Sequence, residues 1–267
     1  MRNWLLALLG ILLLSVCAFA SFISLTTSMD NIVIANDTAV SGVSIKNSGD
    51  EAAWNVKVSL LLPQGFSSDT IYAGKLNAGG TYNGNFNVSR LPGIAKGSYS
   101  IAVLTEYQDA NGYQFSSISP NLIVYETPAG SRITGQLESI TLGEKGSKSM
   151  QLRLMNRDST AHNVSIRIFL PNEITSPDSE KSLSIGPNEE KTVTFTVSNY
   201  GALVGSKYAV FASFDYESDK HYSGFSVGMI EIVKEDMTLV YAAIAIALVL
   251  LLVFVNRQKI FKRRGVQ

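Results

Sequence analysis

Cysteine and histidine are nearly absent from this sequence, which holds one cysteine, Cys17, and two histidines, His162 and His221. A chain with one thiol forms no internal disulfide, so disulfide-stapled scaffolds are excluded. Neither histidine has a second histidine, cysteine or aspartate at ligand spacing, so we expect no zinc site, and we expect no cofactor. Each folded part must therefore be held together by its apolar core.

A cluster of basic residues is also missing between residues 21 and 236. One of the 22 Lys and Arg residues lies before residue 21 and five follow Val255, which leaves 16 cations against all 22 acidic residues, a net charge of −6. Nucleic-acid binding depends on clustered cations that neutralise phosphates. The charge distribution therefore argues against nucleic acid as a partner.

The same region lacks an apolar stripe at helical spacing. Apolar residues instead alternate at period two, as in segments 56–62 and 193–197, a pattern typical of strands with one buried face. Turn signals separate these strands at short intervals; they lie at residues 47–50, 63–65, 78–80, 109–112, 157–159 and 186–188. The pattern predicts an all-β fold.

This β region contains an internal repeat. A shift of 109 residues pairs identical residues in the two copies: Asn47 with Asn156, Tyr99 with Tyr208, Tyr107 with Tyr216, Tyr113 with Tyr222, and Glu126 with Glu235. The segment 55–63 returns as 163–171 at a shift of 108. Because chance does not easily produce such a constant register, the two copies are expected to fold alike.

The repeat divides the chain into two tandem immunoglobulin-like β-sandwiches, residues 21–126 and 127–236, with a short linker at 127–131. Seven or so short strands in about 100 residues is the pattern of such sandwiches. Tyr99 follows Gly97 at the start of a strand, as in a tyrosine corner, where the hydroxyl bonds back to the preceding loop. Tyr208 is expected to do the same job, with its glycine, Gly205, displaced by one residue.

The segment 237–255 is an unbroken run of apolar and small residues, and a basic tail, 256–267, follows it. As a helix this run would span about 28 Å, close to the roughly 30 Å hydrocarbon core of a bilayer. Basic residues flank membrane helices on the cytoplasmic side. We therefore expect one C-terminal transmembrane helix, with the tail inside and residues 21–236 outside the cell.

The N-terminus supports the same orientation. Residues 1–20 have a charged start at Arg2, an apolar core and an A-x-A site at Ala18–Ala20, as in a secretory signal peptide. An uncleaved signal anchor is the alternative, and it also leaves residues 21–236 outside. The expected location is the plasma membrane, with a single-pass type I topology.

Short motifs in the first copy resemble the cysteine-free immunoglobulin-like domains of microbial cell-surface proteins. They lie at Asn47–Gly49, Asn55–Val58, Leu62–Phe66, Leu76–Gly80, Gly97–Tyr99 and Tyr107–Asp109. These domains include the cell-adhesion-related domain of bacteria and archaea and the surface-layer-like domains of archaea. The resemblance implies a prokaryotic surface module and carries over no active site. The second copy departs from it at Arg157, Asp158 and 172–174, where turn glycines are absent.

Two segments match catalytic or metal motifs only superficially. Gly224–Gly228 has the G-x-S-x-G spacing of serine hydrolases, but no helix follows it and both histidines precede Ser226. Asp109–Gly112 begins like a calcium loop but lacks the downstream glutamate, and hairpin turns use the same residues. We therefore predict no enzyme activity, no catalytic residue and no metal site.

Aromatic rings and sequons are the remaining candidate sites. Several tyrosines could form a flat platform for sugar rings or could pack in the core: Tyr72, Tyr82, Tyr107, Tyr113, Tyr216 and Tyr222. Three N-x-S/T sequons, at Asn36, Asn87 and Asn163, would accept glycans in an exported chain.

The sequence thus predicts a non-enzymatic cell-surface protein that presents its two copies for adhesion, ligand binding or spacing. Its partners would be the membrane, through one span, and a protein or carbohydrate outside the cell. The alternative is an accessory subunit of a membrane transport or secretion complex, and carbohydrate binding by the sandwiches is a further hypothesis.

Overall fold

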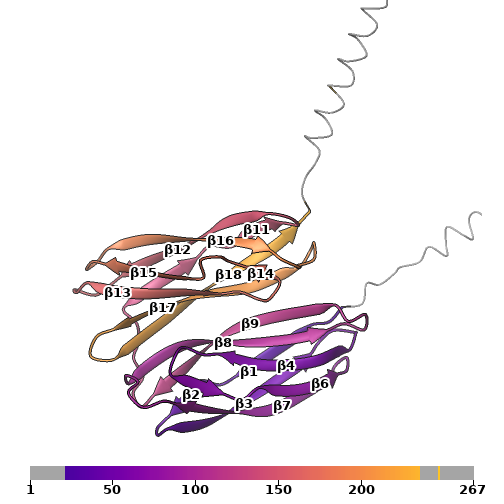
Figure 1. Ribbon diagram of the computed structural model, residues 1–267, viewed down its shortest axis with the longest axis horizontal. Coiled ribbons are helices and arrows are strands. Elements are labelled where there is room, and N and C mark those ends of the chain that lie inside the picture. The colour runs from indigo at the N-terminus through magenta and orange to yellow at the C-terminus, as the bar shows by residue number, and fades with distance from the viewer. Residues whose placement is uncertain (1–21, 235–245, 247–267) are drawn as a thin grey trace, which may run out of the picture.

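The computed structural model describes residues 22–234 and residue 246. Every regular element between residues 22 and 234 is a β-strand, and these strands form two halves that lie against each other (Figure 1). The N-terminal half contains β1 Leu25–Met29, β2 Ile32–Ile34, β3 Thr38–Asn47, β4 Ala53–Leu61, β5 Phe66–Ser68, β6 Ile71–Leu76, β7 Thr81–Arg90, β8 Gly97–Gln108 and β9 Gln114–Tyr125.

The C-terminal half repeats much of this order. It contains β10 Ile133–Leu137, β11 Ile140–Gly143, β12 Ser147–Asn156, β13 His162–Phe169, β14 Ile174–Thr175, β15 Glu180–Ile185, β16 Glu190–Asn199, β17 Lys207–Glu217 and β18 His221–Val233. Each half has one outer sheet, in the order β1-β3-β7-β5 or β10-β12-β16-β14. The remaining strands of both halves join in one ten-stranded sheet.

Period-two alternation explains the core inside each half. In the N-terminal half, Val43 and Phe86 of the outer sheet pack with Ile101 of β8 in one buried cluster. In the C-terminal half, Leu152 and Phe195 of the outer sheet pack with Val210 of β17 in another. Burying a side chain of this size contributes about 1.5–3 kcal/mol, so these clusters hold the sheets of each half together.

A third apolar cluster lies between the two halves. It joins Ala102 and Leu104 of β8 and Ile118 of β9 to Phe169 of β13 and Phe211 of β17. The rings of Phe169 and Phe211 stack with their centroids 4.5 Å apart. Strands β8 and β17 are therefore buried on both faces, since alternate residues of each strand contact the core of its own half and the opposite half.

Polar contacts complete this junction. His221 pairs with Gly97 and is the point at which the ten-stranded sheet passes from β18 to β8. Gly97 has a φ of 147°, and a Cβ atom there would collide with the His221 backbone. Nearby, the Ser223 hydroxyl accepts a hydrogen bond from the Ser100 amide at 2.9 Å and donates one to the Ser100 hydroxyl at 2.6 Å.

The predicted linker at 127–131 takes part in the same junction. The Ala129 side chain is buried and its amide donates to the Ser98 hydroxyl at 2.9 Å. Gly130 forms a parallel bridge with Ser223. The connection between the halves is therefore packed against both of them.

These contacts correct the expected fold class. The prediction of two tandem immunoglobulin-like sandwiches, separated by a linker, was wrong, because one sheet passes through both halves and a shared apolar cluster lies between them. Alternation along β8 and β17 indicated one buried face for each strand. It did not show that the second face is buried as well.

The predicted membrane span also needs correction. Among residues 22–234 and 246, no helix is long and apolar enough to cross a membrane. This finding contradicts the expected C-terminal transmembrane helix and, with it, the expected single-pass type I location in the plasma membrane. The predicted signal 1–20, span 237–255 and tail 256–267 lie outside the described residues, except for residue 246.

Candidate functional site

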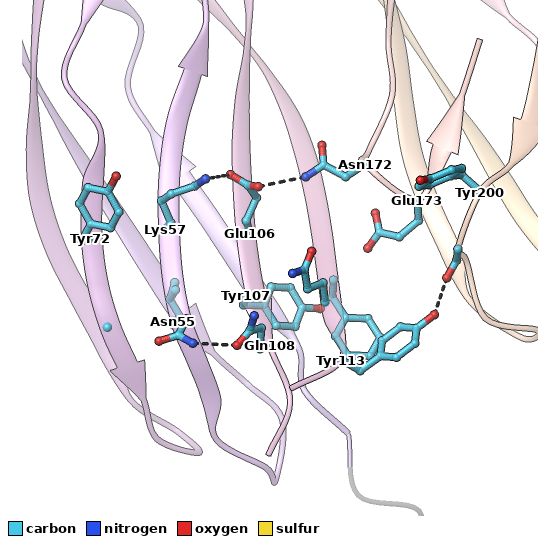
Figure 2. A pocket seen from close by; sticks show the side chains of 15 residues that line it. Asn55, Lys57, Tyr72, Glu106, Tyr107, Gln108, Tyr113, Asn172, Glu173 and Tyr200 are labelled. Carbon is cyan, nitrogen blue, oxygen red and sulfur yellow. Dashed lines mark hydrogen bonds and ion pairs between the residues drawn. The ribbon is translucent and has the colours of Figure 1, made fainter. Parts of the chain in front are cut away.

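A groove of about 660 Å³ opens where the two halves meet. Its floor is the outer face of β4 and β8, beyond the region that the C-terminal half covers. Its wall is formed by two loops of the C-terminal half, one after β13 and one after β16 (Figure 2). The groove therefore exists only because the two halves are docked.

The floor carries two pairs of polar side chains. Lys57 Nζ lies 2.5 Å from Glu106 Oε2, and Glu106 Oε1 accepts a hydrogen bond from Asn172 Nδ2 at 3.0 Å. Asn55 Nδ2 donates to Gln108 Oε1 at 2.7 Å. The hydrogen bond to Glu106 raises the pKa of Lys57, so Lys57 stays charged and tied to its partner.

A β-bulge aims Asn55 into the groove. The register of β4 shifts between Ala53 and Val56, and Asn55 adopts a φ of 51°, in the left-handed region that few residues other than glycine occupy. Opposite the bulge, Gly74 of β6 has a φ of 71°. Bulges redirect side chains and are common beside functional sites, so this irregularity marks the floor of the groove.

Aromatic rings form the sides of the groove. Tyr107 and Phe115 stack with centroids 5.5 Å apart, and Tyr113 packs on Phe115 at 5.0 Å. Burial, together with the charge of Glu173, raises the pKa of Tyr107, so its hydroxyl keeps its proton. Figure 2 shows Tyr72 on one side and Tyr200 on the other, with Glu106 between them.

Tyr72 and Tyr200 are the most exposed aromatic side chains in the described part of the chain. They are 73% and 81% exposed, whereas Tyr113 is 38% exposed. Single exposed apolar residues need no explanation, but these two rings flank one groove. The two rings form a pair of apolar surfaces that face water on opposite sides of a polar floor.

Glu173 attaches the wall to the N-terminal half. Its side chain is buried, and its two carboxylate oxygens accept hydrogen bonds from the amide and the hydroxyl of Ser116, each at 2.5 Å. Its carbonyl oxygen accepts the amide of Tyr200 at 2.9 Å. The Tyr113 hydroxyl donates to the Gly201 carbonyl at 2.5 Å. These bonds set the position of Tyr200 relative to the N-terminal half.

Three of the tyrosines considered as a sugar platform, Tyr72, Tyr107 and Tyr113, lie in this groove. Tyr82 packs against the N-terminal core. Tyr216 and Tyr222 stack on each other with centroids 5.1 Å apart, in the C-terminal half. Three of the six tyrosines proposed as a platform therefore line the groove, and the other three lie elsewhere.

The groove residues of the C-terminal half and the paired polar side chains of the floor were not predicted from the sequence. One signal was present: the second copy departs from the repeat at 172–174, where Glu173 stands in place of Gly65. In the sequence, that departure appears only as the loss of a turn glycine. Nothing in the sequence places Tyr200 beside residues of the first copy, because tertiary docking brings them together.

The two predicted corner tyrosines differ in their hydrogen bonds. Both rings are buried. The Tyr99 hydroxyl donates to the Ala95 carbonyl at 2.6 Å, and its ring stacks on His221 with centroids 3.8 Å apart. Burial raises the pKa of Tyr208 to about 12, while its bond with the Ser206 side chain partly offsets the rise.

The three sequon asparagines, Asn36, Asn87 and Asn163, are exposed. Asn87 Nδ2 donates to Asp69 Oδ2 at 2.8 Å. Glycosylation at these positions stays a prediction.

The motifs that resembled catalytic or metal sites serve structural roles. Ser226 lies within β18, and its hydroxyl accepts the Leu137 amide at 2.8 Å. Asp109 Oδ1 accepts the amides of Asn111 and Tyr113, which closes a turn. Within residues 22–234, no three His, Cys, Asp or Glu side chains are grouped so that they could hold a metal ion.

Comparison with known proteins gives little guidance. A scan against protein-family models finds no match, and a search of curated proteins finds none. Among solved structures, the chain is similar to a protein of unknown function from Porphyromonas gingivalis W83, at 12% identity and a TM-score of 0.31, over 78% of this chain and 99% of that one. A TM-score this low carries no argument, so the resemblance to immunoglobulin-like surface domains stays a prediction.

Proposed function

We propose that the protein is a non-enzymatic binding protein and that its ligand occupies the groove between the two halves. The observation that carries the proposal is the convergence of Tyr72 and Tyr200, which are 73% and 81% exposed, on one groove. Large rings that face water gain free energy when a ligand covers them. Of the roles that the sequence predicts, ligand binding is therefore the one that this arrangement of side chains supports.

The composition of the groove supports the same proposal. Its volume of about 660 Å³ falls within the roughly 300–1,000 Å³ of small-molecule sites, which combine apolar walls with a few placed polar groups. Tyr107 and Phe115 supply apolar surface here, and Asn55 and Gln108 supply polar groups. A ligand with both kinds of surface would find partners for each.

The carboxylates of the groove argue for binding without catalysis. A general acid or base must reach the substrate with an atom that can give or take a proton. Glu106 is held by Lys57 and Asn172, and both carboxylate oxygens of Glu173 accept bonds from Ser116. Both groups are committed to holding the groove in shape.

The groove is also preformed. The hydrogen bonds that Ser116 donates to Glu173 and Tyr113 donates to Gly201 fix the wall on the N-terminal half. A site that is ordered before binding loses less conformational freedom when it is occupied. Binding is therefore expected to leave the two halves in their present arrangement.

Fluorine NMR on the full chain, labelled with 3-fluorotyrosine, tests this proposal. Each of the 11 tyrosines gives its own signal, and the signals are assigned by Tyr→Phe variants. A library of small fragments should shift the Tyr72, Tyr113 and Tyr200 signals before those of Tyr82 and Tyr216. Fragment hits that leave the signals of Tyr72, Tyr113 and Tyr200 unshifted would overturn the proposal.

A further inference from the structure

We infer that the ligand of this groove is a neutral saccharide of at least two sugar units, an inference that rests on the proposed function. The geometry behind it is the order of surfaces across the groove: an exposed ring at Tyr72, a polar floor, and an exposed ring at Tyr200 (Figure 2). Sugar rings present the same alternation, with a flat patch of C–H groups on one face and hydroxyl groups around the rim. Two rings on opposite sides of the floor favour a ligand with more than one sugar unit.

The polar floor suits hydroxyl groups. A hydroxyl both donates and accepts, so it is best met by side chains that do both. Asn55 and Gln108 are joined by one hydrogen bond, which uses only part of the two donors and one acceptor oxygen that each amide carries. Lys57 and Asn172 each direct one N–H group to Glu106 and keep further N–H donors for a ligand.

The charges of the groove disfavour an anionic ligand. Lys57 is the cation that lines it, and it is tied to Glu106 at 2.5 Å. Glu173 adds a second carboxylate. Phosphates and sulfated sugars require clusters of unpaired Lys or Arg, so the preferred sugar is uncharged.

The backbone of the floor disfavours a peptide that binds by strand addition. That mode requires a strand with a free edge. Strand β4 is paired with β6 on one side and β8 on the other, and β8 is paired with β4 and β9. The floor therefore offers side chains rather than backbone groups, which again fits a saccharide.

The test uses the full chain in native gels that contain soluble polysaccharides. The neutral probes are a β-glucan, a mannan and a xylan, and the anionic probes are alginate and heparin. At least one neutral probe should retard the protein, and both anionic probes should not. Tyr72→Ala and Tyr200→Ala should each weaken that affinity about tenfold, which is about 1.4 kcal/mol, because each removes an aromatic ring that would cover apolar sugar surface.

Phe22→Ala is the matched control. Phe22 is 56% exposed and does not line the groove, so its loss should leave retardation unchanged. Because Tyr72 and Tyr200 are also exposed, their variants should keep the thermal midpoint of the parent protein. A weakened affinity in those variants then reports on the groove.

Three results would overturn the inference. The first is retardation by no neutral probe, or by an anionic probe alone. The second is retardation that Tyr72→Ala and Tyr200→Ala leave unchanged. The third is fragment binding that shifts the signals of the groove tyrosines while every saccharide fails to bind. In that case the proposed binding function stands and the saccharide inference is wrong. If fragments and saccharides both fail to bind, the proposed function and the saccharide inference are both wrong.

Discussion

Two equivalent turns show how the halves differ. The turn at Pro63–Phe66 and the turn at Pro171–Ile174 are closed by the same backbone bond, from the fourth residue to the first. In both turns, the carbonyl oxygen of the third residue accepts a hydrogen bond from a backbone amide of a later loop. The donor is Leu91 in the N-terminal half and Tyr200 in the C-terminal half. The third residue itself is Gly65 in one turn and Glu173 in the other.

That single difference changes what the turn contacts. Gly65 has a φ of 95° and packs so closely on Ile94 of its own half that a Cβ atom would lie 2.6 Å from the Ile94 side chain. Glu173 instead extends its carboxylate to Ser116 of the opposite half. The repeat therefore preserves the backbone hydrogen bonds of the turn, although φ is positive at Gly65 and not at Glu173. Its departures form the contacts between the halves.

Asn47 and Asn156 show the opposite case, in which the two copies agree. Both side chains are fully buried. Asn47 Nδ2 donates to the carbonyls of Glu51 and Leu76, and its Oδ1 accepts the Gly49 amide. Asn156 Nδ2 donates to the carbonyls of Thr160 and Gly186, and its Oδ1 accepts the Asp158 amide. Each asparagine ties a turn to a neighbouring strand inside its own half.

The largest expected effect would come from removing these asparagines. Asn47→Ala and Asn156→Ala should each lower the free energy of unfolding by about 3 kcal/mol, because each change leaves several buried backbone groups without a partner. Chemical denaturation followed by circular dichroism measures both values. A cost for one variant more than twice that of the other would break the equivalence of the two turns.

Removing the Glu173 carboxylate should have a smaller effect, because Glu173 joins the halves rather than stabilising one of them. Glu173→Ala should cost about 2 kcal/mol, since hydrogen bonds to a charged group contribute about 1.5–3 kcal/mol, and it should shift the fluorine signals of Tyr113 and Tyr200. Glu144→Ala removes an exposed carboxylate and should stay within about 0.5 kcal/mol. Unshifted groove tyrosines in Glu173→Ala would show that Glu173 does not position the wall.

The smallest expected effect concerns the pH dependence of the junction at His221. Burial acts to lower the pKa of His221, but hydrogen bonds to Asp215 and Glu217 outweigh it and raise the pKa above 6.5. Its contribution to stability should therefore be complete below about pH 6.5 and should be lost as the pH rises through the higher folded pKa. The parent should lose more stability than His221→Gln between about pH 6 and pH 8.5. If denaturation curves show the same loss of stability in the parent and in His221→Gln, His221 does not contribute to the pH dependence.

Some features of the fold could be predicted because they depend on neighbours along the chain. Period-two alternation follows from the geometry of a strand, and it indicates strands without any knowledge of what they contact. The shift of 109 residues likewise paired Asn47 with Asn156, whose bonds to Glu51 and Thr160 span four residues. The tyrosine corner at Tyr99 is equally local, because its acceptor, Ala95, also lies four residues away.

The candidate site depends on contacts that no local pattern encodes. Alternation of apolar residues predicts which residues of β8 share a face, but not which other strand covers that face. The contact of Ala102 and Leu104 with the cluster that contains Phe211 could therefore not be predicted. The bond from Ser116 to Glu173 joins residues 57 positions apart, and that from Tyr113 to Gly201 joins residues 88 apart. The strands and the paired turns can be predicted from the sequence, because they follow from backbone geometry and nearby residues. The docking of the halves and the groove it leaves emerge only in the folded chain, because docking depends on the fit of two surfaces assembled from distant parts of the chain.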